Sequence, residues 1–195
     1  MERADIVQAR AEWRRVQDET PCGHLVFLDE SGAKTNMTRL YGRAPVGERC
    51  FDHAPDGRWK TVTMLSSIRL DGTTECLVFA GALDRRTFEA YVKERLAPAL
   101  KEGDVVVMDN LRAHKSSAAQ QAIEERGARV LFLPAYSPDL NPIEKMWSKV
   151  KQLLRGLKAW NDDELFTAIG QALDKVTASD AKGWFASCGY SNFQS

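Results

Sequence analysis

Two short apolar runs that each end in an aspartate constrain the fold of this chain most strongly. They are "LVFLD", which ends at Asp29, and "VVVMD", which ends at Asp109. Such runs are typical of buried strands whose carboxyl ends open onto a site. Because open sheets place their active sites at the carboxyl edge of such strands, the sequence predicts that Asp29 and Asp109 meet.

The remaining pattern alternates strands with helices and predicts a mixed sheet with helices on both faces. Segments 59–72 and 73–84 read as strands, and together with the segment after Asp29 they predict an antiparallel meander. A helix at 114–126 followed by a buried strand at 128–134 completes a strand-helix-strand unit. Helical spacing also predicts helices over residues 4–18, 84–100, 142–156, 161–176 and 178–187.

The composition limits the classes of partner and compartment. With 27 basic and 27 acidic residues among 195, the net charge is zero, so any site for a polyanion must be local. No apolar run approaches the roughly 20 residues of a membrane span, and the charged start has no secretory signal, so we expect a cytoplasmic protein. The 4 cysteines form no Cys-x-x-Cys pair, which argues against a zinc ribbon or a redox motif.

Converging carboxylates indicate a metal site. Acids brought together at a sheet edge repel one another unless a cation neutralises them or one of them stays protonated. Oxygen ligands without nearby Cys or His suit Mg²⁺ or Mn²⁺. Two such ions about 4 Å apart can activate a nucleophile and stabilise a leaving oxygen, which makes phosphodiester chemistry the leading hypothesis.

The stretch "SPDLNPIEKMW" opens a helix and carries a third candidate acid. With Asn141 as the N-cap, a proline falls at the first helical position and Glu144 at the third, where a capping box places its acid. The same helix start follows a strand that ends at the edge where the two aspartates lie. Glu144 can therefore be a cap or a third ligand, and the spacing alone leaves both interpretations open.

Three stretches resemble the signature motifs of the mariner-like superfamily of DDE transposases, in particular its bacterial insertion-sequence branch, insertion sequence six-thirty. They are "FLDESG", "VVMDNLRAHKS" and "LPAYSPDLNPIEKMWSKVK". As the resemblance requires, 34 residues lie between Asp109 and Glu144. "TRLYGRAPVGERC" also resembles the family's segment after the first acid, so the resemblance covers about residues 24–158.

The resemblance implies a ribonuclease-H-like, retroviral-integrase-like fold with a mixed five-stranded sheet. It implies that Asp29, Asp109 and Glu144 are the catalytic acids and that they hold Mg²⁺ (or Mn²⁺). We expect two such ions, with Asp29 bridging them. The implied reaction is the cut-and-paste movement of transposon ends into a TA target in DNA. We also expect a homodimer that is associated with the nucleoid when bound to DNA. Residues 1–20 would then be a lead-in helix or linker remnant, and residues 21–195 the catalytic domain.

Family members carry paired helix-turn-helix modules ahead of the catalytic domain, whereas this chain has only about 20 residues there. Three hypotheses follow. The chain is an active catalytic domain, served by a separate helix-turn-helix product of another reading frame. It is an inactive truncated fragment that binds and regulates full-length transposase. It is another ribonuclease-H-like nuclease, because fold does not fix function.

Several residues beside the acids have both a functional and a structural interpretation. Near the site, the Asn110 amide could orient Asp109, and the His114 imidazole could contact phosphate or a metal-bound water. Both residues could also simply form the turn and cap of the next helix. Glu30 should point to the opposite face of its strand from Asp29, so we do not expect it to be a ligand.

A basic helix face is the candidate DNA contact. Its cations could bind phosphates, or they could form a solvated face opposite the apolar stripe. They are Lys145, Lys149, Lys151, Arg155 and Lys158. Arg43, with Arg39 and Arg49, lies in the expected strand region after the first acid and is a further candidate to flank a DNA channel. The 5 tryptophans are spread along the chain and read as core anchors.

Overall fold

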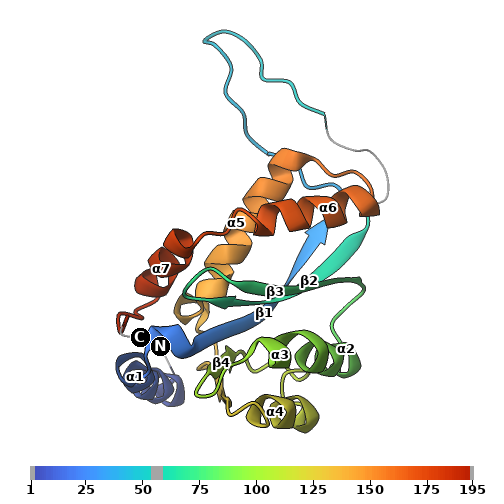
Figure 1. The fold of residues 1–195 in the computed structure, drawn as a ribbon. Helices are drawn as coiled ribbons and strands as arrows, with labels where there is room; N and C mark the ends of the chain where they lie inside the picture. Colours follow the sequence, from blue (N-terminus) through green and yellow to red (C-terminus); the bar gives the residue numbers. More distant parts are fainter. Residues whose placement is uncertain (1–2, 54–58, 194–195) are drawn as a thin grey trace.

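The computed structural model describes residues 3–53 and 59–193 and is built around one five-stranded sheet (Figure 1). The strands are β1 (Leu25–Lys34), β2 (Thr61–Arg69), β3 (Thr74–Ala80), β4 (Val105–Met108) and β5 (Arg129–Phe132), in the order β3-β2-β1-β4-β5. The pairs β1–β2 and β2–β3 are antiparallel, whereas β1–β4 and β4–β5 are parallel. This is the mixed sheet that the sequence predicted.

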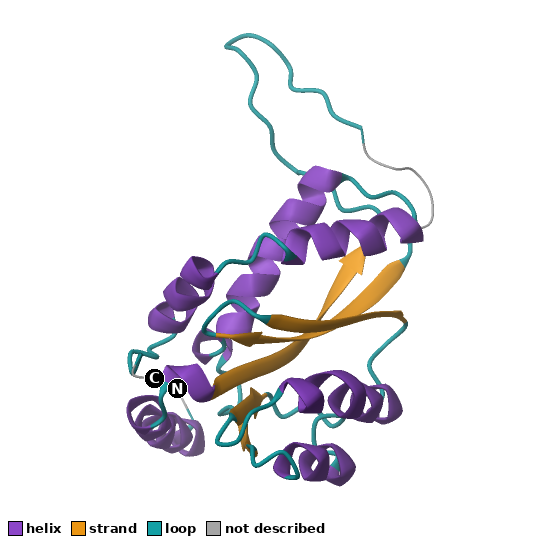
Figure 2. Ribbon diagram, viewed as in Figure 1, coloured by secondary structure: helices purple, strands orange, loops and turns teal. Residues whose placement is uncertain are grey.

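Helices cover both faces of the sheet (Figure 2). They are α1 (Ala4–Glu19), α2 (Arg85–Tyr91), α3 (Ala97–Ala99), α4 (Ser117–Glu124), α5 (Pro142–Leu157), α6 (Asp162–Leu173) and α7 (Ala178–Ser187), and a π-helical turn (Val92–Leu96) joins α2 to α3. Helices α1, α5, α6 and α7 pack in one core cluster, and α2 and α4 pack in the other. No helix in the described ranges has both the length and the apolar character needed to cross a bilayer.

Alternation along β1 explains why both faces are covered. Leu25 and Phe27 belong to the α5-side cluster, and Val26 and Leu28 belong to the α2-side cluster. Successive side chains of a strand point to opposite faces, so a run that is apolar throughout needs a layer on each side. Phe27 anchors the α5 side through an edge-on contact with Phe185 of α7, at 5.2 Å between ring centroids.

The segment after β1 departs from the expected meander. Residues 37–53 contain no helix or strand and extend as a loop away from the body (Figure 1). The expectation that Arg39, Arg43 and Arg49 lie in a strand region is therefore wrong, because all three are exposed on this loop. The closely spaced Gly42, Pro45 and Gly47 interrupt any regular ladder, which explains the difference.

A buried ion pair joins the end of β2 to the start of β4. Arg69 Nη2 lies 2.5 Å from Asp104 Oδ2, and the Asp104 side chain is only 1% exposed. The Lys101 backbone N–H also donates to Asp104 at 2.7 Å. This pair lies at the opposite end of β4 from Asp109, so it belongs to the stability of the fold rather than to the carboxyl edge of the sheet.

Replacing Asp104 with alanine should lower the free energy of unfolding by about 3–5 kcal/mol, because the Arg69 guanidinium would stay buried without its partner. Chemical denaturation measures this change. The exposed Asp71→Ala variant is a control, for which we expect a much smaller loss. A loss for Asp104→Ala no larger than that of the control would contradict the assignment of this pair as a structural anchor.

Candidate active site

The sheet register brings the first two acids to one level. Phe27 of β1 pairs with Val107 of the parallel neighbour β4. Asp29 and Asp109 each lie two residues further along, in the same chain direction. The paired strands therefore place both carboxylates at the level where β4 ends, and the two acids line one pocket, as predicted.

Glu144 reaches the same edge from the first turn of α5. A single pocket of about 390 Å³ is lined by Asp29, Asp109 and Glu144, together with Asn110 and Asn141. The remaining wall is formed by residues 133–138, which connect β5 to α5. The fold thus gathers the middle of β1, the end of β4 and the start of α5 around one cavity. The expectation that Asp29 ends a strand is wrong, because β1 continues to Lys34 through its antiparallel pairing with β2.

Asp29 is the most deeply placed of the three acids. Its side chain is 7% exposed and accepts a hydrogen bond of 2.8 Å from the Glu30 backbone N–H. Burial raises the pKa of Asp29 to about 8, and the negative charges of Glu30, Glu144 and Asp109 add to this effect. Asp29 therefore retains a proton at neutral pH unless a cation compensates its charge.

Asp109 is held by a buried histidine. His114 is 0% exposed, and its Nδ1 lies 2.7 Å from Asp109 Oδ1. Burial opposes the charged imidazolium, but the hydrogen bond to Asp109 and the nearby Glu30 carboxylate outweigh it and raise the pKa of His114 to about 9. Burial likewise opposes the Asp109 carboxylate, but His114 and the Leu111 backbone N–H hold the pKa of Asp109 below its usual value.

Glu30 is the partner that sequence reasoning missed. Its Oε2 lies 3.3 Å from His114 Nε2, so the imidazole stands between Glu30 and Asp109. Glu30 points away from the pocket side of β1, as alternation predicted, but there it meets His114. The sequence shows only that Glu30 points to the opposite face of β1 from Asp29. The packing of the 111–116 turn against β1 places His114 on that face, where it meets Glu30.

The two asparagines have different surroundings. The Asn110 amide donates to the Leu133 carbonyl at 2.8 Å, which ties together the ends of β4 and β5. Asn141 is 4% exposed, and its Oδ1 has no hydrogen-bond partner among the described residues. A buried amide oxygen that lines the pocket without a partner is an available ligand or acceptor.

The capping-box interpretation of Glu144 is wrong. Asn141 is the N-cap of α5 and Pro142 follows it, as predicted, but the Asn141 side chain makes no capping hydrogen bond. By contrast, Thr177 and Asp180 form a complete capping box at the start of α7. Glu144 is exposed and lines the pocket, so its carboxylate is available for another role.

The side-chain atoms around the pocket that could bind a metal are oxygen atoms, which suits a hard divalent cation. The partnerless Asn141 oxygen and the crowding of negative charge at Asp29 fit such an ion. The acids are nevertheless not drawn into a tight cluster: in the part of the chain that is described, no group of three or more His, Cys, Asp or Glu side chains is arranged to hold a metal. Mutual repulsion and the hold of His114 on Asp109 are consistent with this spread.

The basic residues of α5 divide into two sets. Lys149 Nζ lies 2.5 Å from Asp180 Oδ2, and Lys158 pairs with Asp52, so both charges are balanced within the fold. This makes Lys149 a weaker candidate for a phosphate contact than its sequence suggested. Lys145, Lys151 and Arg155 are partly exposed on the same helix, and Arg43 is exposed on the loop after β1.

An exposed aromatic residue stands at the rim of the pocket. Tyr136 is 83% exposed and has φ of 57°, a backbone conformation that residues other than glycine rarely adopt. Sequence reasoning missed Tyr136, because nothing in "PAYSP" distinguishes an exposed ring from a buried one. Its place beside the acids makes it a candidate contact for a flat group of a substrate.

The fold and the carboxylate-lined edge define a ribonuclease-H-like domain. The mariner Mos1 paired-end complex with Mg gives a TM-score of 0.58 at 18% identity, covering 93% of this chain and 64% of that one. The Mos1 paired-end complex with the left transposon end gives a TM-score of 0.56 at 19% identity, covering 97% and 63%. These likenesses establish the fold, and the chain spans less than two thirds of the Mos1 chain in each.

A family model described as DDE superfamily endonuclease matches residues 24–166, and the chain belongs to that family. The Tcb2 transposase of Caenorhabditis briggsae is 31% identical over 194 residues, covering 88% of this chain and 67% of the relative. The Tcb1 transposase of the same organism is 28% identical over 187 residues, covering 87% and 67%. The chain is therefore a catalytic domain homologous to Tc1/mariner transposases.

Without added metal, the stability of the chain should fall as the pH rises from about 5 to about 9. Asp29 holds its proton up to about pH 8 in the fold but ionises near 3.8 when unfolded. His114 stays protonated up to about pH 9 in the fold but only to about 6.5 when unfolded. In both cases the folded state binds more protons over this range, so raising the pH favours unfolding.

Thermal melts in chelator across this range test the prediction. Asp29→Asn, which cannot ionise, should be more stable than the wild type at pH 8 and should flatten the decline. A wild-type melting temperature that rises between pH 5 and pH 8, or an unchanged slope in Asp29→Asn, would show that Asp29 ionises normally.

Proposed function

We propose that this chain is the catalytic domain of a DNA transposase, and that Asp29, Asp109 and Glu144 are its catalytic acids. The main support for this proposal is that the three carboxylates line one pocket in a chain of the DDE endonuclease family. The proposed reaction first hydrolyses a phosphodiester at an element end, which leaves a 3′-hydroxyl. That hydroxyl then attacks a target phosphodiester, so one phosphodiester forms as another breaks.

Asp29, Asp109 and Glu144 would together hold two Mg²⁺ or Mn²⁺ ions. Divalent ions at such a site lower the pKa of the attacking oxygen and stabilise the leaving oxygen. The oxygen donors and the raised pKa of Asp29 support this assignment. The Mos1 structures described as complexes with Mg and with Mn are consistent with a divalent ion in this fold.

The protein's own groups would prepare the site before substrate binds. His114 fixes one oxygen of Asp109 and is itself backed by Glu30, so the Asp109 carboxylate has a defined direction. The Asn141 oxygen would accept a bond from water or substrate at the pocket wall. Tyr136 would pack against a base or sugar at the rim, where its ring is exposed.

The proposed partner is DNA, with a TA target and transposon ends as the substrates. A Mos1 structure of similar fold is described as a paired-end complex with the left transposon end, which supports this choice. Phosphate contacts would come from the partly exposed cations of α5, namely Lys145, Lys151 and Arg155, and from Arg43 on the loop. Because the net charge is zero, binding should depend on this local basic surface.

We further propose that the chain acts as a homodimer of the bacterial insertion-sequence branch, in the cytoplasm at the nucleoid. The loop after β1 supports the dimer. Leu40, Tyr41, Val46 and Phe51 are 81–107% exposed on it, and such apolar side chains favour burial against a partner. The motif "SPDLNPIE" supports the branch, and a helix-turn-helix product of a separate frame would supply end recognition.

Replacing Glu144 with glutamine tests whether this residue is a metal ligand. The change keeps the side-chain length but removes the anionic oxygen, so DNA cleavage and strand transfer in Mg²⁺ or Mn²⁺ should be abolished. Because Glu144 raises the pKa of Asp29, the melting temperature in chelator should stay level or rise. Activity on end-containing duplex DNA, with the recognition module supplied, and thermal melts measure both effects.

Glu124→Gln, at an exposed position on α4, is the matched control and should keep full activity. Normal strand transfer by Glu144→Gln would remove Glu144 from the proposed acids. A wild-type chain that binds DNA ends but never cleaves them would instead favour the regulatory-fragment hypothesis.

Metal addition should stabilise the folded chain, and more strongly at pH 8 than at pH 5. The ion and the proton compete for Asp29, so a higher pH favours the ion. Differential scanning fluorimetry with Mn²⁺, Mg²⁺ and chelator measures the shift. A melting temperature that does not respond to millimolar Mn²⁺ at pH 8 would contradict the metal site.

A further inference from the structure

The loop of residues 135–141 forms one wall of the pocket and ends where α5 begins. Ala135, Tyr136, Ser137, Pro138 and Asn141 all line the pocket. Tyr136 adopts a left-handed backbone conformation, which persists only where surrounding contacts fix the chain. Because α5 starts directly after this loop, the shape of the loop sets where the first turn of α5 stands.

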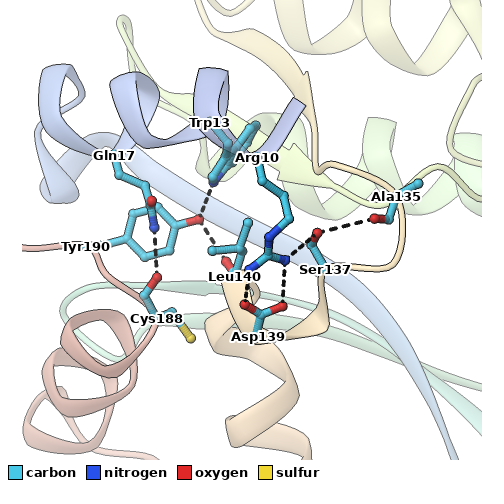
Figure 3. A network of polar contacts seen from close by, with 9 residues as sticks. All are labelled: Arg10, Trp13, Gln17, Ala135, Ser137, Asp139, Leu140, Cys188 and Tyr190. Carbon is cyan, nitrogen blue, oxygen red and sulfur yellow. Dashed lines mark hydrogen bonds and ion pairs between the residues drawn. The ribbon is translucent and has the colours of Figure 1, made fainter. Parts of the chain in front are cut away.

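Arg10 of α1 holds this loop through contacts with Ser137 and Asp139 (Figure 3). Its Nη1 donates to Ser137 Oγ at 2.8 Å and to Asp139 Oδ1 at 3.0 Å. Its Nη2 donates to Asp139 Oδ2 at 2.6 Å. A planar guanidinium that binds both oxygens of one carboxylate fixes geometry as well as distance, and the third bond goes to a serine that is only 5% exposed.

A second tie from α1 reaches the end of the same loop (Figure 3). The Trp13 indole N–H donates to the Tyr190 hydroxyl at 2.9 Å, and that hydroxyl donates to the Leu140 carbonyl at 2.8 Å. Gln17 donates to the Cys188 carbonyl at 2.8 Å, which fixes the segment that carries Tyr190. One face of α1 therefore holds the loop directly through Arg10 and indirectly through Tyr190.

The Arg10–Asp139 pair is better suited to position the loop than to stabilise the fold. The two side chains are 35% and 58% exposed, and ion pairs in such surroundings contribute little to global stability. The bonds from Arg10 nevertheless hold the pKa of Asp139 below its usual value, so the carboxylate stays charged and paired near neutral pH. Losing the pair should loosen residues 135–144 locally and leave the sheet intact.

We propose that Arg10 is a positioning residue of the active site, which holds the loop of residues 135–141 in the shape that presents Glu144 to the pocket. The inference rests on the proposed function for the role of Glu144, and on the contacts of Arg10 for the hold on the loop. Helix α1 then supports the pocket wall, although no residue of α1 lines the pocket.

Hydrogen exchange and Mn²⁺ affinity of the full chain test this role in Arg10→Gln and Asp139→Asn. We expect the backbone amides of Leu140, Asn141 and Glu144 to exchange about fivefold faster, and the Mn²⁺ dissociation constant to rise by a similar factor. Strand amides of β1 and β4 should exchange as in the wild type. The double variant should be no worse than Arg10→Gln, because that change already removes the contact with Asp139.

Two further variants sharpen the test. Arg10→Lys keeps the charge but not the planar fork, so it should restore only part of the wild-type behaviour. Arg15→Gln removes an exposed arginine from the same helix and should change neither readout. Unchanged exchange of the three amides in Arg10→Gln would overturn the proposal, and so would acceleration spread evenly over the chain. If the wild type binds no Mn²⁺, the proposed function fails, and the exchange pattern alone then decides the role of Arg10.

Discussion

The parallel pairing of β1 with β4 is the contact on which the candidate site depends. It sets the ends of two apolar runs side by side and in the same direction, so that Asp29 and Asp109 line one pocket. Both strands are buried between two helical layers, which prevents either from shifting its register without exposing apolar side chains. The location of the acids is therefore set by the hydrophobic core.

The fold must also offset the repulsion that follows from this placement. Asp29 does so by holding its proton more tightly, since burial and neighbouring charges raise its pKa to about 8. Asp109 instead has a cationic partner in His114, and the Glu30 carboxylate lies on the other side of the same imidazole. Two carboxylates at one edge thus have opposite pKa shifts, and a divalent cation would displace the proton from the first while leaving the partner of the second in place.

The third acid is positioned differently from the other two. Glu144 stands on a helix start, and the loop before it contains a left-handed residue at Tyr136. The contacts that fix this loop come from α1 and from the chain near Tyr190, far away in the sequence. The two aspartates are thus held by the sheet, whereas the glutamate depends on packing at the periphery.

Much of this arrangement followed from the sequence. Apolar runs and helical spacing predicted the sheet and the helices, because hydrophobic periodicity is a local property. The family resemblance, with its 34-residue interval, implied which three acids would lie around one pocket. The extended loop after β1 was mispredicted, since local alternation does not reveal whether a strand has a neighbour to pair with. The partnership of Glu30 with His114 and the hold of Arg10 on Asp139 were decided only by the tertiary structure. Each joins residues whose meeting depends on how separate elements pack, and no local pattern encodes that packing.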